Sequence, residues 1–286
     1  MAPAEKPILD SAAEDWSGEM GERWLANVDR FEGMIAPVGQ ALLERAAFRD
    51  GERVIDIGCG AGATSLDIAK RIGARGAVLG VDISPVLIAA AEGRAHVAGA
   101  ANVRFRCADA ATASLDEPPF DRAFSRFGVM FFADARAAFA NLHRFVRRGG
   151  RIDFSVWAPA RENAWVAQTL AAIGQFVALP APTPRAPGPF ALDDPAYVGE
   201  LLEGAGFSSV AFETWRGDQP IGGPGATPEE AVAFVFDAMS FGKMLDEAGT
   251  DTRAKVRGKL LELYTRYRAS DGIRMSGTAY FVTARS

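Results

Sequence analysis

The chain is poor in cysteine and histidine, and this scarcity excludes several classes of protein. Its 286 residues include two cysteines and two histidines. Two cysteines cannot build the disulfide framework of a small secreted protein, and the N-terminus lacks the basic start and apolar stretch of a secretory signal. A cytoplasmic location is therefore expected. The histidines, His96 and His143, are expected at the surface, so the sequence offers no catalytic base and no metal site.

The chain also lacks an excess of positive charge and a long apolar run. Its 31 Lys and Arg residues face 36 Asp and Glu residues, a formal net charge of −5. Nucleic-acid-binding proteins usually carry a strongly basic face, so no nucleic-acid partner is expected. The basic residues within 143–148 are interpreted as cations at a helix C-terminus before a glycine turn. The apolar stretch 164–182 contains Gln168 and Gln175 and ends in prolines, so no membrane span is expected.

What the chain does contain is typical of an α/β enzyme. Hydrophobic residues make up 49% and charged residues 23% of the sequence, enough to bury a sizeable core. We find no internal repeat. Five prolines between residues 180 and 189 exclude helix and central strand there, so this segment is predicted to run extended over the surface as a linker.

A glycine-rich turn between a buried strand and a helix is the most informative segment. The apolar residues 54–57 predict the strand, Gly58, Gly60 and Gly62 form the turn, and residues 63–72 predict the helix. Glycine lets the backbone bend sharply and leaves no side chain between the chain and a ligand. The first turn of the helix presents unpaired N–H groups to that ligand. This layout is typical of nucleotide binding.

An acidic residue follows the next predicted strand and points to a ribose. Asp82 ends the apolar strand at 77–82, where a carboxylate can accept hydrogen bonds from both ribose hydroxyls. Two nucleotide classes fit the glycines. Gly58, Gly60 and Ala63 satisfy the dinucleotide pattern, so an NAD-dependent oxidoreductase stays open as an alternative.

The residues around this turn carry a resemblance to a known family. Asp56 precedes the glycines in a D-x-G-x-G-x-G pattern, a third strand at 102–109 ends in Asp109, and a fourth at 120–125 runs into the segment 126–132. Gly149 and Gly150 then precede a fifth strand at 151–156. This ordered series resembles the class I S-adenosylmethionine (SAM) dependent methyltransferases over about residues 50–157.

Within that family, the segment 125–132 looks like the bacterial small-molecule group related to ubiquinone and menaquinone methyltransferases. Arsenite methyltransferases share the nucleotide core but have extra cysteines that this chain lacks. The resemblance implies a doubly wound, seven-stranded α/β sheet of Rossmann-like type. It also implies that the last strand, at 278–283, inserts antiparallel between the fifth and sixth.

The resemblance further implies a division of the chain. Residues 1–48 are expected to form an N-terminal helical cap, and residues 49–286 the SAM-binding domain, with lid helices at about 160–180 and 226–269. Inside the second lid segment, Thr227, Pro228 and Glu230 match a helix N-terminus with a capping box. That helix is predicted to extend to about Ala248, with Phe234, Phe241 and Met244 as candidate pocket residues.

The resemblance assigns roles at the cofactor site, with SAM as cofactor and S-adenosylhomocysteine (SAH) as product. Asp82 would hold the ribose, Ile83 the adenine face, Asp109 with Ala110 the adenine edge, and the glycine turn the methionine portion. The full expected set is Asp56, Gly58, Cys59, Gly60, Gly62, Asp82, Ile83, Asp109, Ala110 and Ser125. Cys59 is expected to have a packing role. The alternative is a reactive thiolate, because the helix N-terminus beside Cys59 could lower its pKa.

The acceptor side is inferred from aromatic residues. The candidates are Trp16, Trp24, Arg126, Phe127, Met130 and Trp157. A plain core role competes for the aromatic residues, and surface exposure competes for Arg126. The expected function is in-line methyl transfer to a small, apolar or aromatic molecule by a monomer or homodimer. A non-catalytic SAM-binding module is the remaining alternative.

Overall fold

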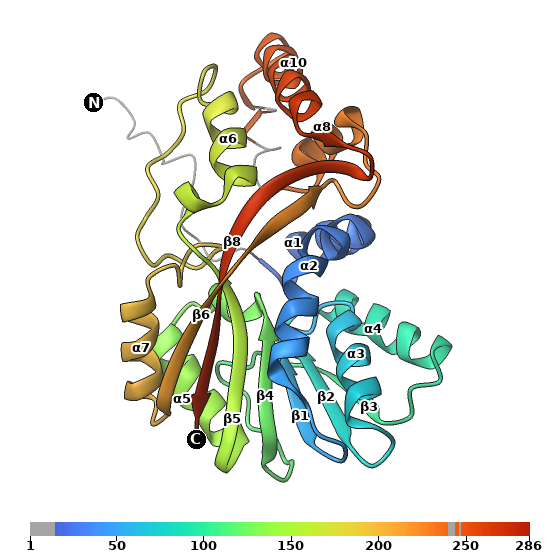
Figure 1. Cartoon of the computed structure of the whole chain (residues 1–286), viewed down its shortest axis with the longest axis vertical. Coiled ribbons are helices and arrows are strands. Elements are labelled where there is room, and N and C mark those ends of the chain that lie inside the picture. Colours follow the sequence, from blue (N-terminus) through green and yellow to red (C-terminus); the bar gives the residue numbers. More distant parts are fainter. Residues whose placement is uncertain (1–14, 240–243, 246) are drawn as a thin grey trace, which may run out of the picture.

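A single mixed β-sheet organises the chain (Figure 1). The computed structural model describes residues 15–239, 244, 245 and 247–286. The strand order is β3-β2-β1-β4-β5-β8-β6, and a two-residue strand, β7 (Arg268–Ala269), pairs with β8 off this path. The predicted α/β fold class is confirmed, with seven strands on the main path.

The first five strands are parallel and form the nucleotide-binding half of the sheet. They are β1 (Arg53–Ile57), β2 (Ala77–Asp82), β3 (Val103–Cys107), β4 (Phe120–Arg126) and β5 (Val146–Trp157). β1 lies at the centre, and its residues from Val54 to Ile57 are buried because helices cover both faces of a parallel sheet. The carboxyl ends of these strands meet at one edge, where ligands bind in open α/β folds.

Helices cover both faces of the sheet, as Figure 1 shows. On one face lie α2 (Val28–Ala46), α3 (Ala63–Ile72) and α4 (Pro85–Val97), and on the other lie α5 (Ala135–Phe145) and α7 (Pro195–Gly204). The bounds of α3 and β2 coincide with the prediction. The interpretation of residues 143–148 is wrong for Arg147 and Arg148, because β5 already begins at Val146, opposite Phe120.

Two long antiparallel strands complete the sheet. β8 (Gly272–Arg285) pairs antiparallel with both β5 and β6 (Ser208–Ile221). This confirms the expected insertion of the last strand between the fifth and sixth. Both strands are longer than the predicted ranges of 210–215 and 278–283, because each continues past the sheet into a layer of helices above it (Figure 1).

This upper helical layer consists of α6 (Ala164–Ile173), α8 (Pro228–Asp237) and α10 (Thr250–Arg266), with the ends of β6 and β8. α10 packs against both α6 and α8. The capping box at the start of α8 is confirmed: Thr227 Oγ1 accepts from the Glu230 N–H at 3.2 Å, and a Glu230 carboxylate oxygen accepts from the Thr227 N–H at 2.8 Å. α8 ends at Asp237, earlier than predicted, and Phe241 lies outside the described residues.

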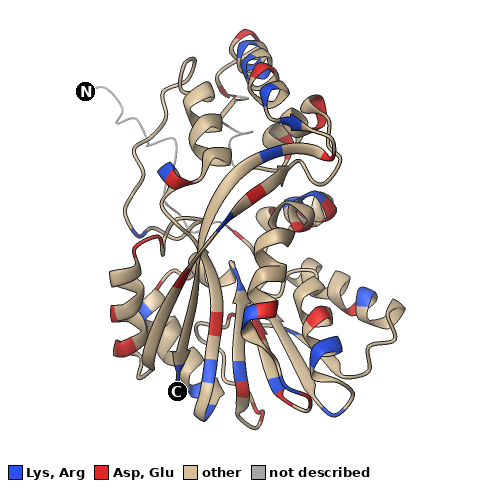
Figure 2. Ribbon diagram, viewed as in Figure 1, with Lys and Arg blue, Asp and Glu red and all other residues tan. Residues whose placement is uncertain are grey.

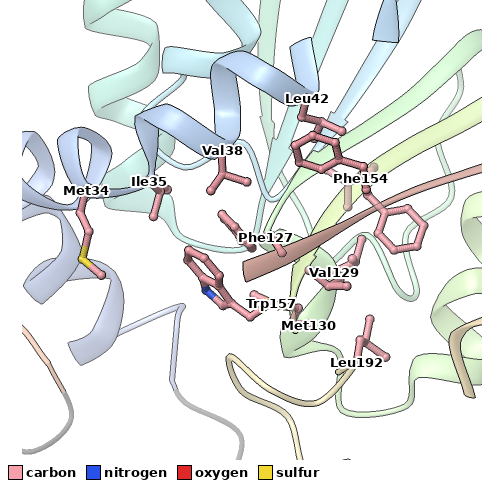
Figure 3. Close-up of a cluster of buried hydrophobic side chains, with 14 of the residues drawn as sticks. Met34, Ile35, Val38, Leu42, Phe127, Val129, Met130, Phe154, Trp157 and Leu192 are labelled. Carbon is pink, nitrogen blue, oxygen red and sulfur yellow. The ribbon is translucent and has the colours of Figure 1, made fainter. Parts of the chain in front are cut away.

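A buried apolar cluster joins α2 to the carboxyl ends of β4 and β5 (Figure 3). Met34, Val38 and Leu42 repeat at four-residue spacing, which puts them on one face of α2. Phe127 and Trp157 pack below this face, with their rings stacked at a centroid distance of 4.2 Å. The cluster fixes the position of α2 over the sheet. A short 3-10 helix, η1 (Gly128–Phe131), follows Phe127.

Charged residues of both signs are interspersed along the elements coloured in Figure 2. The amphipathic α10, for example, carries both signs along its length. In the part of the chain that the structure describes, each helix is too short or too polar to cross a membrane.

Candidate cofactor and acceptor site

The turn between β1 and α3 shows why glycine is needed at two different kinds of position. Gly58 has a φ of +66°, and a Cβ there would lie 2.7 Å from the backbone Cα of Gly128. Gly60 has a φ of +55°, yet a Cβ there would meet no atom within 4 Å. Gly58 is therefore required by packing, whereas Gly60 leaves open space in front of the turn.

Asp82 faces this open space with both carboxylate oxygens held in place. One oxygen accepts from the Gly60 N–H at 2.8 Å and the other from the Ser84 N–H at 2.9 Å. Burial raises the pKa of this carboxyl, while the backbone N–H groups of Ser84 and Gly60 oppose the rise. Each oxygen has a second lone pair available. The next residue, Ile83, is 43% exposed and offers an apolar surface beside the carboxylate.

The loop after β3 is also fixed by its own hydrogen bonds. An Asp109 carboxylate oxygen accepts from the Ala111 N–H at 2.9 Å, and the other accepts from the Thr112 hydroxyl at 3.1 Å. The Asn141 side chain on α5 donates to the Ala110 carbonyl at 2.9 Å. Asp109 and Ala110 thus form a rigid edge beside Ile83, at the carboxyl end of the sheet.

A cavity of about 1340 Å³ connects these groups to an aromatic wall. Its cofactor-facing side includes Gly58, Cys59, Gly60, Asp82, Ile83, Asp109 and Ala110, and its far side includes Arg126, Phe127, Met130, Phe131, Trp157 and Trp165. A pocket for one drug-sized ligand usually has about 300–1,000 Å³. The space therefore suits two molecules held against each other.

Aromatic rings from the N-terminal segment close one side of the cavity. Trp16 lies 4.9 Å from Phe131 in edge-to-face geometry and 5.6 Å from Trp24 between ring centroids. Trp24 stacks on Phe31 at 4.0 Å, and Phe31 contacts Phe234 of α8 at 4.9 Å. Trp16 and Trp24 both line the cavity, whereas Phe234 is buried behind it.

Three of the expected cofactor residues lie behind the cavity wall rather than in it. Asp56 is buried, accepts from the Ser65 hydroxyl at 2.7 Å, and has its pKa raised by burial to about 7. Ser125 donates to the Ile57 carbonyl at 2.7 Å and accepts from the Gly128 N–H at 3.2 Å. Gly62 packs against Phe105 and Ala91. The geometry gives these residues the task of supporting the turn and not direct contact.

Comparisons with known proteins agree with this geometry. A family model described as a methyltransferase domain matches residues 54–150. Aklanonic acid methyltransferase DauC from Streptomyces sp. (strain C5) is 36% identical over 119 residues, which cover 42% of this chain and 54% of that protein. Nocamycin O-methyltransferase from Saccharothrix syringae is 26% identical over 258 residues, covering 87% and 90%. Residues 54–150 therefore match a methyltransferase domain, and over 87% of its length the chain is similar to a known O-methyltransferase.

Solved structures share the fold of this chain at low sequence identity. The YcgJ protein from Bacillus subtilis superposes with a TM-score of 0.56 at 16% identity, covering 87% of this chain and 98% of that one. Phosphoethanolamine N-methyltransferase 2 from Haemonchus contortus, in complex with SAM, gives a TM-score of 0.52 at 18% identity, with coverages of 87% and 52%. The match to aklanonic acid methyltransferase spans about half of that relative's length.

The residues present at this site fit SAM as a cofactor. The paired oxygens of Asp82 suit two ribose hydroxyls, Ile83 suits a flat apolar ring, and the open space at Gly60 suits a group that approaches the backbone closely. The dinucleotide interpretation of the glycines is not supported.

The cysteine in the turn has the wrong environment for a nucleophile. Burial raises the pKa of the Cys59 thiol well above its ordinary value, and the nearby carboxylates of Asp56 and Asp82 raise it further. The neutral thiol is therefore the stable form, and it weakly approaches the Gly60 carbonyl at 3.7 Å. The packing interpretation of Cys59 is favoured over thiolate chemistry.

Several residues of the cavity wall were missed by sequence reasoning. Met20, Phe31 and Glu32 come from the N-terminal helices, Trp165 from α6, and Asp193 from the segment before α7. The proline-rich residues 182–189, interpreted as a linker, also line the cavity. The tryptophan and the proline cluster are visible in the sequence, but only the tertiary contacts show which surface they cover.

Both histidines lie apart from the residues of the cavity wall. The His143 ring packs edge-on against Phe207 at 4.8 Å and its Nε2 lies 3.2 Å from the Ser286 hydroxyl. His96 is in the last turn of α4. We therefore assign no catalytic base.

Proposed function

We propose that this chain is a SAM-dependent methyltransferase that transfers the methyl group of SAM to a small, apolar or aromatic acceptor. The observation that carries this proposal is the continuity of the cavity from Asp82 and Asp109 to the aromatic wall. Tryptophan and phenylalanine provide large apolar contact area and prefer aromatic partners in stacked or edge-on geometry. Two similar proteins, an aklanonic acid methyltransferase and a nocamycin O-methyltransferase, support an acceptor of small-molecule size.

In this proposal each part of the cofactor has a defined partner. Asp82 binds the ribose hydroxyls, Ile83 covers the adenine face, and Asp109 with Ala110 bind the adenine edge. The turn from Gly58 to Gly60 contacts the methionine portion. The supporting residues Asp56, Gly62 and Ser125 hold the turn in shape, so their effect on binding is indirect.

The chemistry requires positioning more than proton transfer. When bound, SAM supplies a methyl group already activated by its sulfonium centre. The stacked pair of Phe127 and Trp157 offers a rigid surface against which an acceptor is oriented for in-line displacement. Holding two reactants in productive geometry can lower a barrier by about 7–11 kcal/mol. The enclosed apolar wall also keeps water from the reacting atoms.

We further propose that two parts of the chain enclose the reactants. The N-terminal region up to residue 48, described from residue 15, acts as a cap through Trp16 and Trp24. The segments 160–180 and 226–269 act as a lid, since α6 supplies Trp165 and the end of α8 leads to Met239 in the wall. We also propose that the chain acts in the cytoplasm as a monomer or homodimer, without a nucleic-acid partner.

The direct test is formation of SAH from SAM with a panel of phenols, aromatic acids and apolar alcohols. Phe131→Ala is the first variant, because Phe131 is half-buried in the cavity wall. We expect the KM for an active acceptor to rise about tenfold, about 1.4 kcal/mol, without a change in SAH affinity. Phe176→Ala is the control, since Phe176 is 39% exposed and outside the wall.

Two results would count against this proposal. Equal acceptor KM values for Phe131→Ala and Phe176→Ala would remove the acceptor site from the aromatic wall. Micromolar SAM binding without SAH formation from any acceptor in the panel would favour the alternative of a SAM-binding module without turnover.

A further inference from the structure

One cation in the cavity wall is left without an anion. Arg126 is the last residue of β4, pairs with Ser155 of β5 and lines the cavity. Protein surrounds its guanidinium, and the surface that stays accessible faces the cavity. Among the described residues, no carboxylate lies within 4.0 Å of it and no hydrogen bond from it is found. Buried charges in proteins are normally paired.

The acidic residues nearest to Arg126 are engaged with other groups. Glu32 accepts from Arg94 at 2.8 Å, Asp56 accepts from Ser65 at 2.7 Å, and Asp67 lies 3.3 Å from the Lys70 ammonium. Their charges reach Arg126 only at longer range. Burial lowers the pKa of Arg126, and Glu32, Asp56 and Asp67 oppose this fall. An arginine stays charged even so, because its ordinary pKa is far above neutral.

The fold makes room for this arginine at a specific place. Gly39 on α2 lies against it, and a Cβ at that position would come within 2.7 Å of Arg126 Cδ and 3.2 Å of Nη1. A glycine in the middle of a helix costs roughly 0.5–1 kcal/mol relative to alanine. Gly39 therefore lowers the stability of α2 but leaves room for the Arg126 guanidinium under the helix.

A second arginine in the wall shows the contrast. Arg185 has its guanidinium 4.0 Å from the centre of the Tyr197 ring and 4.0 Å from an Asp194 carboxylate oxygen. It is thus held by an aromatic face and an acid, while Arg126 faces the cavity with its five donors unused.

We propose that Arg126 is a carboxylate-binding residue of the cavity. The guanidinium forms two parallel hydrogen bonds to a carboxylate, the geometry that arginine makes best. Two sources supply this group: the amino-acid carboxylate of SAM and a carboxylate on the acceptor. The proposal rests on the proposed function for the identity of these molecules, but the anion preference of Arg126 can be measured without turnover.

The test is calorimetric titration of the full chain with four probes. SAH carries the amino-acid carboxylate and 5′-methylthioadenosine lacks it, while benzoate carries a carboxylate and benzamide is its neutral counterpart. The variants are Arg126→Gln and Arg126→Met, two neutral replacements, so that poor folding of one leaves the other. Arg104→Gln is the control, because Arg104 lies outside the cavity wall and is bonded to Glu117 at 3.0 Å.

If Arg126 binds the carboxylate of SAM, both neutral variants lose at least tenfold in SAH affinity and keep their affinity for 5′-methylthioadenosine. If it binds the acceptor, SAH affinity is retained and affinity for benzoate falls at least tenfold, with benzamide unchanged. The proposal would be overturned if both variants bind SAH and benzoate as tightly as the wild type does. It would also be overturned if neither the wild type nor the variants bind SAH or benzoate measurably. Failure of SAH alone to bind the wild type would remove the proposed function and leave the benzoate comparison to decide on Arg126.

Discussion

At the scale of single residues, Asp82 combines two tasks in one carboxylate. It accepts from the backbone at Gly60 and Ser84, and it faces the cavity. Asp82→Asn removes the charge and turns an NH₂ donor toward one of these N–H groups. We expect SAH affinity to fall by about 2–4 kcal/mol, since hydrogen bonds to a charged group contribute about 1.5–3 kcal/mol each. Calorimetry measures this directly.

Asp121→Asn is the matched control for this change. Asp121 also accepts from a backbone N–H, that of Arg53, at 2.8 Å, and it lies outside the cavity wall. SAH affinity should be unchanged in this variant. An equal loss in both variants would indicate a general effect on the fold and would contradict the ribose assignment.

Asp56 gives the stability of the molecule a pH dependence of known sign. Its pKa is raised by burial from 3.8 to about 7, so between these values the folded chain keeps a proton that the unfolded chain releases. The free energy of unfolding must therefore fall as pH rises through this window, by about 1.4 kcal/mol per unit. Arg126 and the Ser65 hydroxyl moderate the effect, whereas Asp82 adds to it.

Asp56→Asn removes this titration and keeps an oxygen that can accept from Ser65. We expect the variant to gain stability relative to the wild type from pH 4 to pH 7, by roughly 4 kcal/mol at most, and to show no further relative gain above that range. Urea unfolding at several pH values provides the measurement. Parallel pH profiles of the two proteins would show that Asp56 is ionised in the folded state throughout.

At the scale of elements, the turn between β1 and α3 contains one glycine that the packing of the fold requires and one that ligand binding requires. A left-handed conformation costs a non-glycine residue about 1–2 kcal/mol, and both Gly58 and Gly60 adopt it. Gly58→Ala adds a clash with the Gly128 backbone, so we expect a larger loss of unfolding free energy than in Gly60→Ala. Gly60→Ala should fold, yet lose at least tenfold in SAH affinity, because its new methyl group enters the open space.

Urea unfolding and SAH titration of both variants distinguish these effects. A Gly60→Ala protein that binds SAH like the wild type would show that the cofactor does not approach this part of the turn. Equal destabilisation by the two substitutions would mean that the contact with Gly128 relaxes at little cost.

The same segment shows how far the sequence predicts the fold. The bounds of α3 and β2 were predicted to the residue, because a strand of apolar residues, glycines and a helical period are all local signals. The early start of β5 at Val146, the length of β6 and β8 and the existence of β7 were missed. The length of β6 and β8 depends on pairing between strands far apart in sequence, such as Arg216 with Thr278. β7 is a two-residue strand that pairs locally, Arg268 with Ile273, and is too short to leave a periodic signal in the sequence.

At the scale of the whole molecule, the cavity is built from segments that are distant in the sequence. Trp16 comes from before α1 (Glu19–Ala26), Phe127 directly follows β4, and residues 182–189 belong to the proline-rich segment. The aromatic candidates Trp16, Trp24, Phe127 and Trp157 and the apolar candidate Met130 all lie in its wall. Asp56 and Ser125 could not be separated from their neighbours by sequence, because alternation along a strand does not tell which polar residue reaches the ligand and which one supports the backbone.

This arrangement predicts which segments exchange their amide hydrogens more slowly when the ligands bind. Residues 183–191 have no regular secondary structure and few backbone hydrogen bonds, among them Gly188 N–H to the Met130 carbonyl at 3.1 Å. We expect SAH together with an active acceptor to slow amide hydrogen exchange about tenfold in this segment and in α1 (Glu19–Ala26). α10 lies outside the cavity wall and serves as the internal control. Protection confined to the glycine turn would contradict closure of these segments over the ligands.

The position of β8 has a consequence for how the chain acquires its structure during synthesis. β6 is made first, but its neighbour in the sheet is β8, which follows after the 50 residues from Gly222 to Asp271 that include α8 and α10. Until residues 272–285 emerge, β5 has an open edge and β6 has no strand to join. The nucleotide-binding strands can therefore assemble on the ribosome before β8 anchors the upper helices. Of the cavity wall, α6 with Trp165 is held in place last, because it packs against α10 and β8.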